Sequence, residues 1–530
     1  MNRACLCLTG FAVTLAIGCG NRDPDLERGF DLMAPAALEG HVVFVDRQRE
    51  RAHVLAVSDS KASASARVLR LPPQPLQHAP RFEHPDELLV LCAGRLDDGR
   101  KEPAPAAVAV LESGRVDRVY EFETRFNAMT QSPDGKRLFL FFDPRSTNTV
   151  EGLLFNPNEV AVIDLNAPPA AGINPTLRTL SSFGGVPQSV VFSAPMDIAG
   201  EKRELAIVLF DSDIAVWDLN HIDRPEYTIE LSRRTTGSIA LSQVLFGGEE
   251  PNIYLRGTAS DDIFVINLSA SGGGTENDFV PSINQLGAGA GPADMVLYDE
   301  PGGGEISGGR RLFVVAQGSA QGSVIDNASS RVTTVPLPVA PNRILRFDAG
   351  KLEDPEAQQR ALLYAEGSDA VVFVDLEGLE DRGGRNVELL RLRSPYRRVL
   401  KLSEELVLLI HQGQGLSLLD LVQRTVQPIQ STQDLGTAVP AHGKLWLAPA
   451  NQQRIGFLDL QTFHPAEIRL DATILDAVAV PSAERPRFVV THPSSIGYFT
   501  VLDGREPDNF AAAYSVRGFL VDDIMTAGGR

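Results

Sequence analysis

The chain has little cysteine, with four residues among 530. Three of them, Cys5, Cys7 and Cys19, lie close to the N-terminus, so Cys92 has no partner in the rest of the chain. No disulfide can therefore stabilise the body of the protein, although exported proteins commonly use them. Cys92 ends the apolar run Glu87–Cys92, which predicts a buried and unreactive thiol. Stability must come from packing.

Positive charge and long hydrophobic runs are also scarce. Lysine and arginine number 49 against 68 aspartates and glutamates, which gives a net charge of -19 at pH 7. This balance argues against binding to nucleic acid and against direct adsorption to anionic lipid, and its simplest meaning is solubility. Beyond the N-terminal segment, no apolar run approaches the roughly 20 residues of a membrane-spanning helix. The hydrophobic fraction of 43% is nevertheless ample for a large core.

Sequence motifs for catalysis and for cofactors are missing as well. There is no Cys-x-x-Cys-His haem motif and no Gly-x-Ser-x-Gly nucleophile elbow. The glycine-rich run Gly287–Pro292 lacks the third glycine of a dinucleotide loop. The nine histidines are scattered, and acid pairs such as Asp261–Asp262 lack the spacing of a calcium loop. The sequence therefore predicts no cofactor, no metal and no catalytic residue.

The N-terminus has the organisation of an export signal. Arg3 provides a positive start, Ala4–Gly18 is mostly apolar, and small residues precede Cys19. The run Leu15–Cys19 resembles a bacterial lipobox, with an alanine in the position of the consensus leucine. The resemblance implies cleavage before Cys19 and acylation of that cysteine; an ordinary secretory signal is the alternative. In both cases we expect an exported protein, and Gly20 favours a lipid anchor in the outer membrane of a bacterial cell envelope.

The body of the chain repeats a short apolar strand that ends in an acidic or amide residue. Val160–Asp164 and Val371–Asp375 are clear copies, and each copy follows another apolar strand and a polar loop. Such strand–loop–strand units are β-hairpins. Their spacing of 39 to 59 residues is typical of a propeller, in which each repeat forms one blade. The ten closing positions are Asp59, Glu112, Asp164, Asp218, Asn267, Asp326, Asp375, Asp420, Asp459 and Asp503.

The strands of these hairpins are apolar on both sides. Val160–Ile163 has no charged residue, although successive side chains of a strand point to opposite faces. A propeller blade needs this pattern because a neighbouring blade covers each side. A further strand precedes each hairpin, as in Ser189–Phe192, and another follows it, as in Thr228–Leu231. We therefore predict an all-β fold, a β-propeller of seven to ten four-stranded antiparallel blades, in which the closing acids form turns.

The segment Ser132–Gly135 reads Ser-Pro-Asp-Gly, which resembles the turn of YVTN-type and WD40-like bacterial propeller repeats. Several repeats also enter their first strand through a proline, as at Pro187 and Pro395. The resemblance implies a propeller lipoprotein. The sequence is compatible with three arrangements: one ring of ten blades, an eight-bladed ring with irregular ends, or two smaller rings. The lack of a central linker favours one continuous array. The expected organisation is a signal peptide at 1–18, a tether at 19–34, the propeller at 35–523 and a tail at 524–530.

Basic residues gather in the predicted first strands of two consecutive repeats. Because first strands surround the axis of a propeller, we predict a binding site there for an anion or an acidic peptide. Arginine suits this role because it binds carboxylate or phosphate with two donors at once. The predicted site residues are Arg343, Arg346, Tyr396, Arg397, Arg398 and Lys401. The alternative is internal pairing with the acids Glu404, Glu405, Asp294 and Asp476.

These observations favour a non-enzymatic platform that binds other proteins at the cell envelope. The partners expected are envelope proteins or an acidic ligand, with membrane contact through the N-terminal lipid only and no nucleic acid. The alternatives are an enzyme of the hydrolase or lactonase type at the mouth of the propeller channel, and a sensor of a small ligand or glycan. Several ionisable side chains meeting at the axis would favour the enzyme, whereas an exposed patch would favour the platform.

Overall fold

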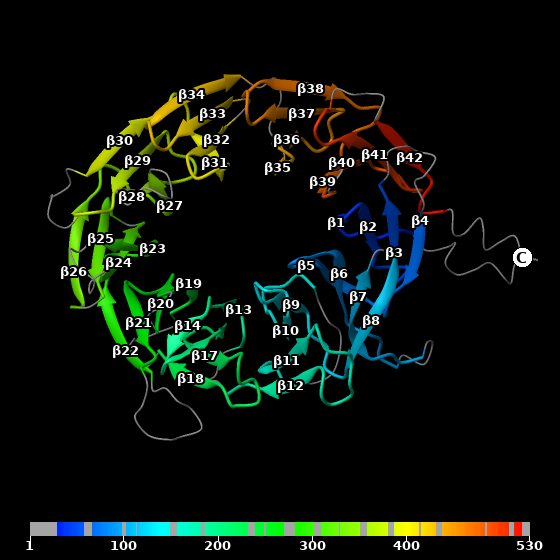
Figure 1. Cartoon of the computed structure of the whole chain (residues 1–530), viewed down its shortest axis with the longest axis horizontal. Coiled ribbons are helices and arrows are strands. Elements are labelled where there is room, and N and C mark those ends of the chain that lie inside the picture. The colour runs from blue at the N-terminus through cyan, green and yellow to red at the C-terminus, as the bar shows by residue number, and fades with distance from the viewer. Residues whose placement is uncertain are drawn as a thin grey trace, which may run out of the picture.

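The computed structural model shows ten four-stranded antiparallel sheets arranged as the blades of one closed ring (Figure 1). This confirms the predicted fold class and places the blade count at the upper end of the predicted range. It also selects one continuous array over an eight-bladed ring or two smaller rings. The structure describes residues 29–57, 66–97, 102–112, 114–148, 156–181, 186–231, 239–247, 251–269, 281–300, 309–317, 319–327, 329–349, 358–379, 386–412, 415–430, 437–482, 485–507 and 513–521.

Blades 1 to 5 follow one another along the N-terminal half of the chain. Blade 4 differs from the others because the hairpin β14–β15 is inserted between its first two strands. The strands are β1 (Ala36–Leu38), β2 (His41–Asp46), β3 (Arg51–Ala56) and β4 (Ala66–Arg70) in blade 1; β5 (Pro75–Arg81), β6 (His84–Cys92), β7 (Ala106–Glu112) and β8 (Arg115–Phe122) in blade 2; β9 (Ala128–Gln131), β10 (Arg137–Phe141), β11 (Glu159–Asp164) and β12 (Thr176–Thr179) in blade 3; β13 (Ser189–Phe192), β14 (Met196–Ile198), β15 (Glu201–Arg203), β16 (Leu205–Leu209), β17 (Asp213–Asp218) and β18 (Tyr227–Glu230) in blade 4; and β19 (Leu241–Phe246), β20 (Asn252–Gly257), β21 (Asp262–Asn267) and β22 (Ser282–Gly287) in blade 5.

Blades 6 to 10 complete the ring with four strands each and no inserted hairpin in the part described. The strands are β23 (Pro292–Glu300), β24 (Gly309–Ala316), β25 (Gln321–Asp326) and β26 (Arg331–Pro336) in blade 6; β27 (Arg343–Ala349), β28 (Gln358–Tyr364), β29 (Ala370–Asp375) and β30 (Val387–Arg391) in blade 7; β31 (Tyr396–Lys401), β32 (Leu406–His411), β33 (Gly415–Asp420) and β34 (Thr425–Gln430) in blade 8; β35 (Thr437–Ala441), β36 (Lys444–Ala448), β37 (Arg454–Asp459) and β38 (Pro465–Arg469) in blade 9; and β39 (Asp476–Val480), β40 (Arg487–Thr491), β41 (Tyr498–Asp503) and β42 (Tyr514–Arg517) in blade 10.

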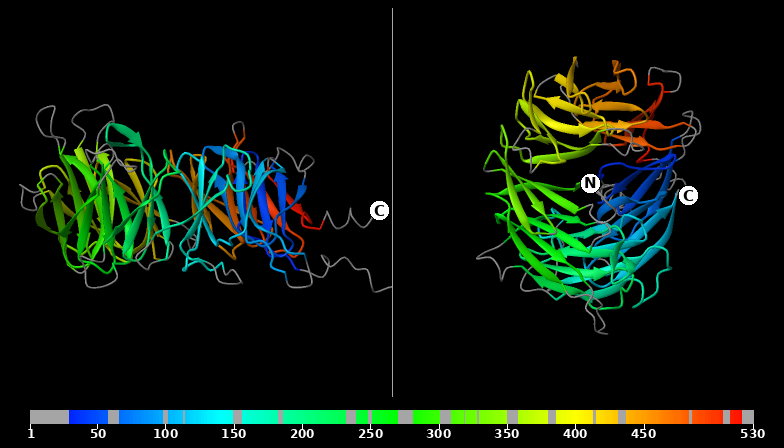
Figure 2. Two further views of the ribbon diagram at one scale, coloured as in Figure 1. Left: turned by 90° about the horizontal axis from the view of Figure 1, so that it is seen from below. Right: turned by 60° about the vertical axis from the view of Figure 1, so that its left-hand side comes forward.

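The first strand of each blade lies nearest the axis and the fourth lies at the rim (Figure 1). The strands are antiparallel, so the turns from first to second and from third to fourth strand lie on one face of the disc, which we call face A. The turns from second to third strand and the links between blades lie on the other, face B. Seen from the side, the strands run between these two faces (Figure 2). Within the described residues, no helix is long and apolar enough to cross a membrane.

The core consists of layers between neighbouring blades. The middle strands are apolar on both sides, and β16 is buried along its whole length. Ten buried apolar clusters result, one at each boundary between two blades. At the boundary of blades 3 and 4, for example, Phe139 meets Trp217 edge-on with the ring centroids 5.7 Å apart. Cys92 is buried in the layer between blades 1 and 2, as predicted, and burial raises the pKa of its thiol. Cys5, Cys7 and Cys19 lie outside the described residues.

Most of the described acids that close the third strands accept backbone hydrogen bonds in the turn that follows, as predicted. Asp459 accepts hydrogen bonds from the backbone N–H groups of Gln461 and Thr462 at 3.0 and 2.9 Å, and Asp420 accepts equivalent bonds in blade 8. Five of these acids also pair with a cation directly opposite, at the start of the second strand. The pairs are Arg137–Asp164 (3.9 Å), Arg311–Asp326 (2.7 Å), Arg360–Asp375 (2.9 Å), Lys444–Asp459 (2.9 Å) and Arg487–Asp503 (3.3 Å). The predicted first closing acid, Asp59, lies outside the described residues.

The ring closes where the last blade meets the first. Each blade is one continuous piece of chain, so blades 10 and 1 share no strand. Their boundary is instead an apolar layer in which Phe44 of β2 meets Phe519 with ring centroids 4.9 Å apart. Phe30 and Leu32, which precede β1, pack against the same layer. One backbone hydrogen bond, from Gly40 N–H to the Pro481 carbonyl, crosses the seam at 2.9 Å.

Candidate functional site

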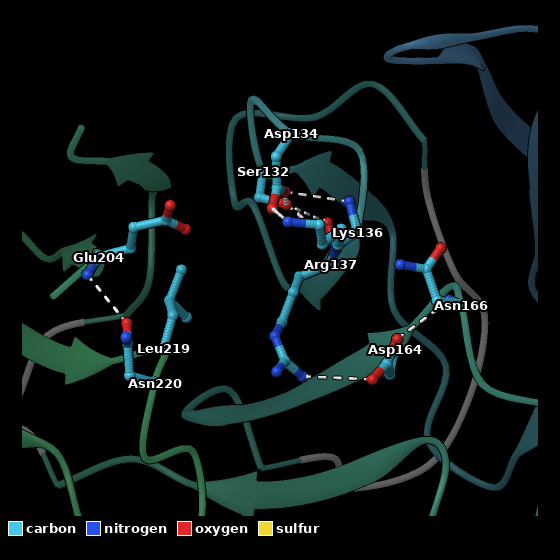
Figure 3. Close-up of a pocket in the computed structure, with 9 residues that line it drawn as sticks. All are labelled: Ser132, Asp134, Lys136, Arg137, Asp164, Asn166, Glu204, Leu219 and Asn220. Carbon is cyan, nitrogen blue, oxygen red and sulfur yellow. Dashed lines mark hydrogen bonds and ion pairs between the residues drawn. The ribbon is translucent and has the colours of Figure 1, made fainter. Parts of the chain in front are cut away.

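A polar cavity of about 370 Å³ opens on face A between blades 3 and 4 (Figure 3). Its walls come from the turns at the ends of both blades, so the side chains that line it belong to segments far apart in the sequence. Arg137 reaches from one of these turns toward Asp164, while Glu204 and Asn220 form the opposite wall (Figure 3). The lining residues are Ser132, Asp134, Lys136, Arg137, Asp164, Asn166, Glu204, Leu219 and Asn220.

The turn between β9 and β10 forms the upper wall and contains the Ser-Pro-Asp-Gly sequence. The Ser132 hydroxyl donates to Asp134 at 2.6 Å, and the Lys136 backbone N–H donates to the same carboxylate at 3.0 Å. Partial burial opposes ionisation of Asp134, but these bonds outweigh it and lower the pKa of its carboxyl. Gly135 has a φ of +64°, and a Cβ there would lie 2.1 Å from the Phe82 carbonyl oxygen. The turn therefore needs glycine both for its conformation and for its contact with blade 2.

Blade 2 fixes this wall from behind. Arg81 is 3% exposed and donates to the Gly135 carbonyl at 2.7 Å and to the Asn166 side chain at 2.5 Å. Its third contact is an ion pair with Glu87 at 2.8 Å. A buried guanidinium with these partners holds both turns of blade 3 against the neighbouring blade. The cavity is therefore formed in advance of any ligand.

The inserted hairpin of blade 4 forms the opposite wall. Arg203, at the end of β15, is buried and pairs with Asp218 at 3.2 Å and with Glu201 at 2.8 Å. The next residue, Glu204, donates its backbone N–H to the Asn220 side chain at 3.0 Å. The half-buried Glu204 carboxylate acts across the cavity on Lys136, whose pKa is raised mainly by its hydrogen bond to Asp134 and to a smaller degree by Glu204. The cavity thus presents both signs of charge.

Two large apolar side chains are exposed in turns of face A that adjoin or belong to the turns lining this cavity. Phe82, in the turn between β5 and β6, is 50% exposed, and its backbone contacts the Gly135 turn. Ile173, in the turn between β11 and β12, is 74% exposed. Exposed aromatic and aliphatic side chains around polar groups are typical of surfaces that bind other proteins. Such a site can hold a polypeptide segment, with hydrogen bonds inside the cavity and apolar contacts at its edge.

The basic residues predicted at the axis do lie on the first strands of consecutive blades. Arg343 and Arg346 belong to β27, and Arg397, Arg398 and Lys401 belong to β31. Arg343, Arg397 and Arg398 are exposed and lie toward face B, because they are at or near the starts of their strands.

The other members of the predicted group have local roles. Arg346 donates to the Leu297 carbonyl of blade 6 at 2.9 Å, and Lys401 pairs with Glu404 at 2.6 Å near face A. Tyr396 is fully buried between blades 7 and 8; burial raises the pKa of its phenol to about 12, and its hydroxyl donates to the Ala370 carbonyl at 3.2 Å. Of the internal pairings that the alternative named, the structure contains Lys401–Glu404. Ligand binding by the exposed arginines stays a prediction.

Sequence reasoning missed the cavity of blades 3 and 4. One signal was present, since Ser132–Gly135 was recognised as a propeller turn but not as a wall of a site. The inserted hairpin gave none, because its strands have only three residues each, too few for an alternating pattern to stand out from the sequence. Within the described residues, no group of three or more histidine, cysteine, aspartate or glutamate side chains is placed to hold a metal ion.

No protein-family model and no curated protein matches this chain. Among solved structures, dihydro-heme d1 dehydrogenase NirN in complex with DHE is similar at 11% identity and a TM-score of 0.39, over 76% of this chain and 81% of that one. Apo AztD from Citrobacter koseri is similar at 11% identity and a TM-score of 0.31, over 70% and 93%. A eukaryotic initiation factor is similar at 9% identity and a TM-score of 0.44, over 89% and 94%. These similarities are too low to bear on function.

Proposed function

We propose that the protein is a non-enzymatic interaction platform, anchored in a bacterial envelope membrane by a lipid on Cys19. An envelope protein binds to face A around the cavity of blades 3 and 4. The observation that supports this proposal is the exposure of Phe82 and Ile173 in turns that adjoin or line a preformed polar cavity. An interface of this kind buries its apolar anchors while charged and amide groups at its edge fix the orientation.

The charges in the cavity favour recognition over catalysis. Asp134 is bound by Ser132 and Lys136, and Asp164 accepts the Asn166 backbone N–H at 3.0 Å. Carboxylates held in this way are oriented acceptors, suited to donors on a partner. General acid–base catalysis needs a carboxyl whose pKa lies near the working pH, whereas the pKa of Asp134 is lowered.

Site-specific photo-crosslinking tests the binding surface. A photoreactive amino acid at Ile173 is expected to give one discrete adduct with an envelope protein in intact cells. The matched control is Val422, which is 38% exposed in the equivalent turn of blade 8 on the same face. The second variant, Phe82→Ser, should reduce the adduct formed from position 173. Adducts of equal yield from positions 173 and 422, or none from either, would contradict the proposal.

The anchor is tested separately. Replacement of Cys19 by alanine should abolish the incorporation of labelled fatty acid and release the protein from the membrane fraction, whereas Cys7→Ala should change neither. Fatty-acid labelling that persists in the Cys19 variant would exclude this site of attachment.

A further inference from the structure

The seam between the last and first blades contains a second pocket, on the opposite face from the cavity described above. It has a volume of about 290 Å³ and opens on face B, because it is lined by the turn between β40 and β41 and by the chain that enters β39 and β1. The residues that carry the argument are Phe44, Leu475, Asp476, His492 and Tyr498.

One wall of the seam pocket is aromatic and held in place. The rings of Tyr498 and His492 are 4.3 Å apart, and the guanidinium of Arg517 lies 4.3 Å from the Tyr498 centroid. Arg517 also donates to the Tyr498 hydroxyl at 3.2 Å. Both imidazole nitrogens of His492 have partners, at 2.9 Å to the Thr473 carbonyl and at 2.8 Å to the Thr500 hydroxyl. His492 is therefore a fixed part of the wall and is not free to transfer protons to a ligand.

The edge of the pocket is apolar and open to solvent. Leu475, which lines it, is 60% exposed, and Ile496, which precedes the lining residue Gly497, is 44% exposed. Gly497 has a φ of +84°, and a Cβ there would come within 2.6 Å of the Phe519 ring. The turn can thus approach the aromatic layer closely only because this residue is glycine. The result is an open pocket with apolar and aromatic walls.

Asp476 places a negative charge among these groups. Its carboxylate accepts the Ala477 backbone N–H at 2.8 Å, and no lysine, arginine or histidine of the described residues forms an ion pair with it. Asp476 is half-buried and lines the pocket together with Tyr498. A carboxylate in a pocket with apolar and aromatic walls is a combination that attracts an organic cation.

We infer that the seam pocket binds a cation that carries an aromatic or aliphatic group, with the positive charge at Asp476 and the hydrocarbon against Tyr498, Phe44 and Leu475. The net charge of -19 supports this choice, because an acidic surface raises the local concentration of cations. The cation is either a free organic amine or a basic side chain of a peptide. The inference is independent of the proposed function, since it concerns face B.

Binding of 2-phenylethylamine to the full-length protein tests the inference, measured by saturation-transfer NMR and titration calorimetry. 3-Phenylpropionate is the matched probe, since it has the same ring and linker with the opposite charge. We expect the amine to bind and the carboxylate to bind at least about tenfold more weakly, the factor expected for a charge-assisted contact. Equal binding of the two probes would overturn the inference.

Two variants locate the site. Asp476→Asn keeps the shape of the side chain and should weaken amine binding by about tenfold, and Leu475→Ser should reduce the apolar contact at an exposed position without adding a charge. Glu366→Gln, in the turn between β28 and β29 of blade 7 on the same face, removes an exposed charge outside the pocket and should have no effect. Unchanged binding in Asp476→Asn would contradict the inference, as would equal losses in the variants at positions 476 and 366.

A second probe distinguishes a free amine from a basic side chain of a protein. It is an acetylated and amidated Phe-Lys peptide, which has no free terminus. If it binds at least as tightly as the amine, the ligand is a basic segment of a protein. If only the amine binds, the ligand is a free small molecule. Photo-crosslinking from position 173 reports on face A, so a failure here is distinguishable from a failure of the proposed function.

Discussion

The boundary between blades 9 and 10 and the boundary between blades 10 and 1 are both buried apolar layers, but they are built differently. At the first, the chain runs directly from β38 to β39, and Trp446 stacks on Phe488 with centroids 4.1 Å apart and planes 5° from parallel. At the second, no chain connects the two blades. The layer there includes Phe30 and Phe519, which belong to no strand.

The difference shows how a ring of continuous blades closes. In a repeat array, each unit contacts only its neighbours, and these interfaces contribute much of its stability. The terminal blades would each leave one apolar side exposed, and the seam covers both sides at once. Where a connecting segment is lacking, side chains before β1 and after β42 extend the apolar layer. The seam is therefore the boundary at which the ring should open first.

The largest expected effect comes from removing the ring that joins both sides of the seam. Phe519 is buried and contacts Phe44, Phe499 and His53. Phe519→Ala should lower the free energy of unfolding by about 3–5 kcal/mol, as for other buried aromatics, and should speed hydrogen exchange selectively in β1 and β39. Trp446→Ala should cost a similar amount without selective exchange at the seam. Uniform exchange changes in both variants would show that the seam is no weaker than other boundaries.

A smaller loss is expected from the segment before β1. Phe30 is half-buried, and the guanidinium of Arg49 lies 3.6 Å from its centroid. Phe30→Ala should lower the free energy of unfolding by about 1–2 kcal/mol, since a fully buried side chain of this size contributes about 1.5–3 kcal/mol. Denaturant unfolding measures the effect. A change equal to that of an exposed substitution such as Val422→Ala would mean that the segment does not stabilise the closed ring.

The cross-strand ion pairs should contribute equally at the two boundaries, because each pair lies within one blade. Blade 9 contains Lys444–Asp459 and blade 10 contains Arg487–Asp503. The pKa of Asp459 is lowered, mainly by its contact with Lys444, so the pair stabilises the folded state above the unfolded pKa of about 3.9. This contribution is lost as the pH falls through the lower pKa of the folded state. Because the pair is partly exposed, Lys444→Met should cost about 1 kcal/mol or less at pH 7. The difference from wild type should narrow toward pH 2; a constant difference would contradict the assignment.

The smallest effect on stability is expected from the exposed arginines near the axis. The double variant Arg343→Glu and Arg397→Glu should change the free energy of unfolding by no more than about 0.5 kcal/mol. If these residues bind anions, the variant should lose affinity for hexaglutamate in calorimetry. Arg331→Glu, on the outer strand of blade 6, is the control and should retain that affinity. If the double variant and Arg331→Glu bind hexaglutamate with equal affinity, Arg343 and Arg397 do not form an anion-binding site.

Much of the fold could be predicted because each blade repeats one local pattern. An apolar strand buried on both sides and closed by an aspartate recurs in the sequence, and counting Asp164 and its equivalents gives the number of blades. The closing aspartate bonds to backbone N–H groups only two or three residues further along the chain. Because this role is local, the sequence alone can indicate it. The inserted hairpin of blade 4 has no comparable local signal.

The sites could be predicted only in part, because they depend on contacts between blades. Phe82 and Ile173 are 91 positions apart and belong to different blades. The seam pocket joins the two ends of the described chain, which no repeat pattern brings together. The first strands at the axis were correctly located, but burial of Tyr396 depends on which side of β31 faces blade 7. Periodicity therefore predicts the blades, whereas ring closure and insertions determine the sites.

Electron cryomicroscopy of the purified protein tests the central claim most directly, through class averages viewed along the axis of the ring. The structure predicts a single closed disc with ten radial spokes and density across the boundary between the first and last blades. Seven or eight spokes, two separate rings or an open arc with a gap at the seam would contradict it.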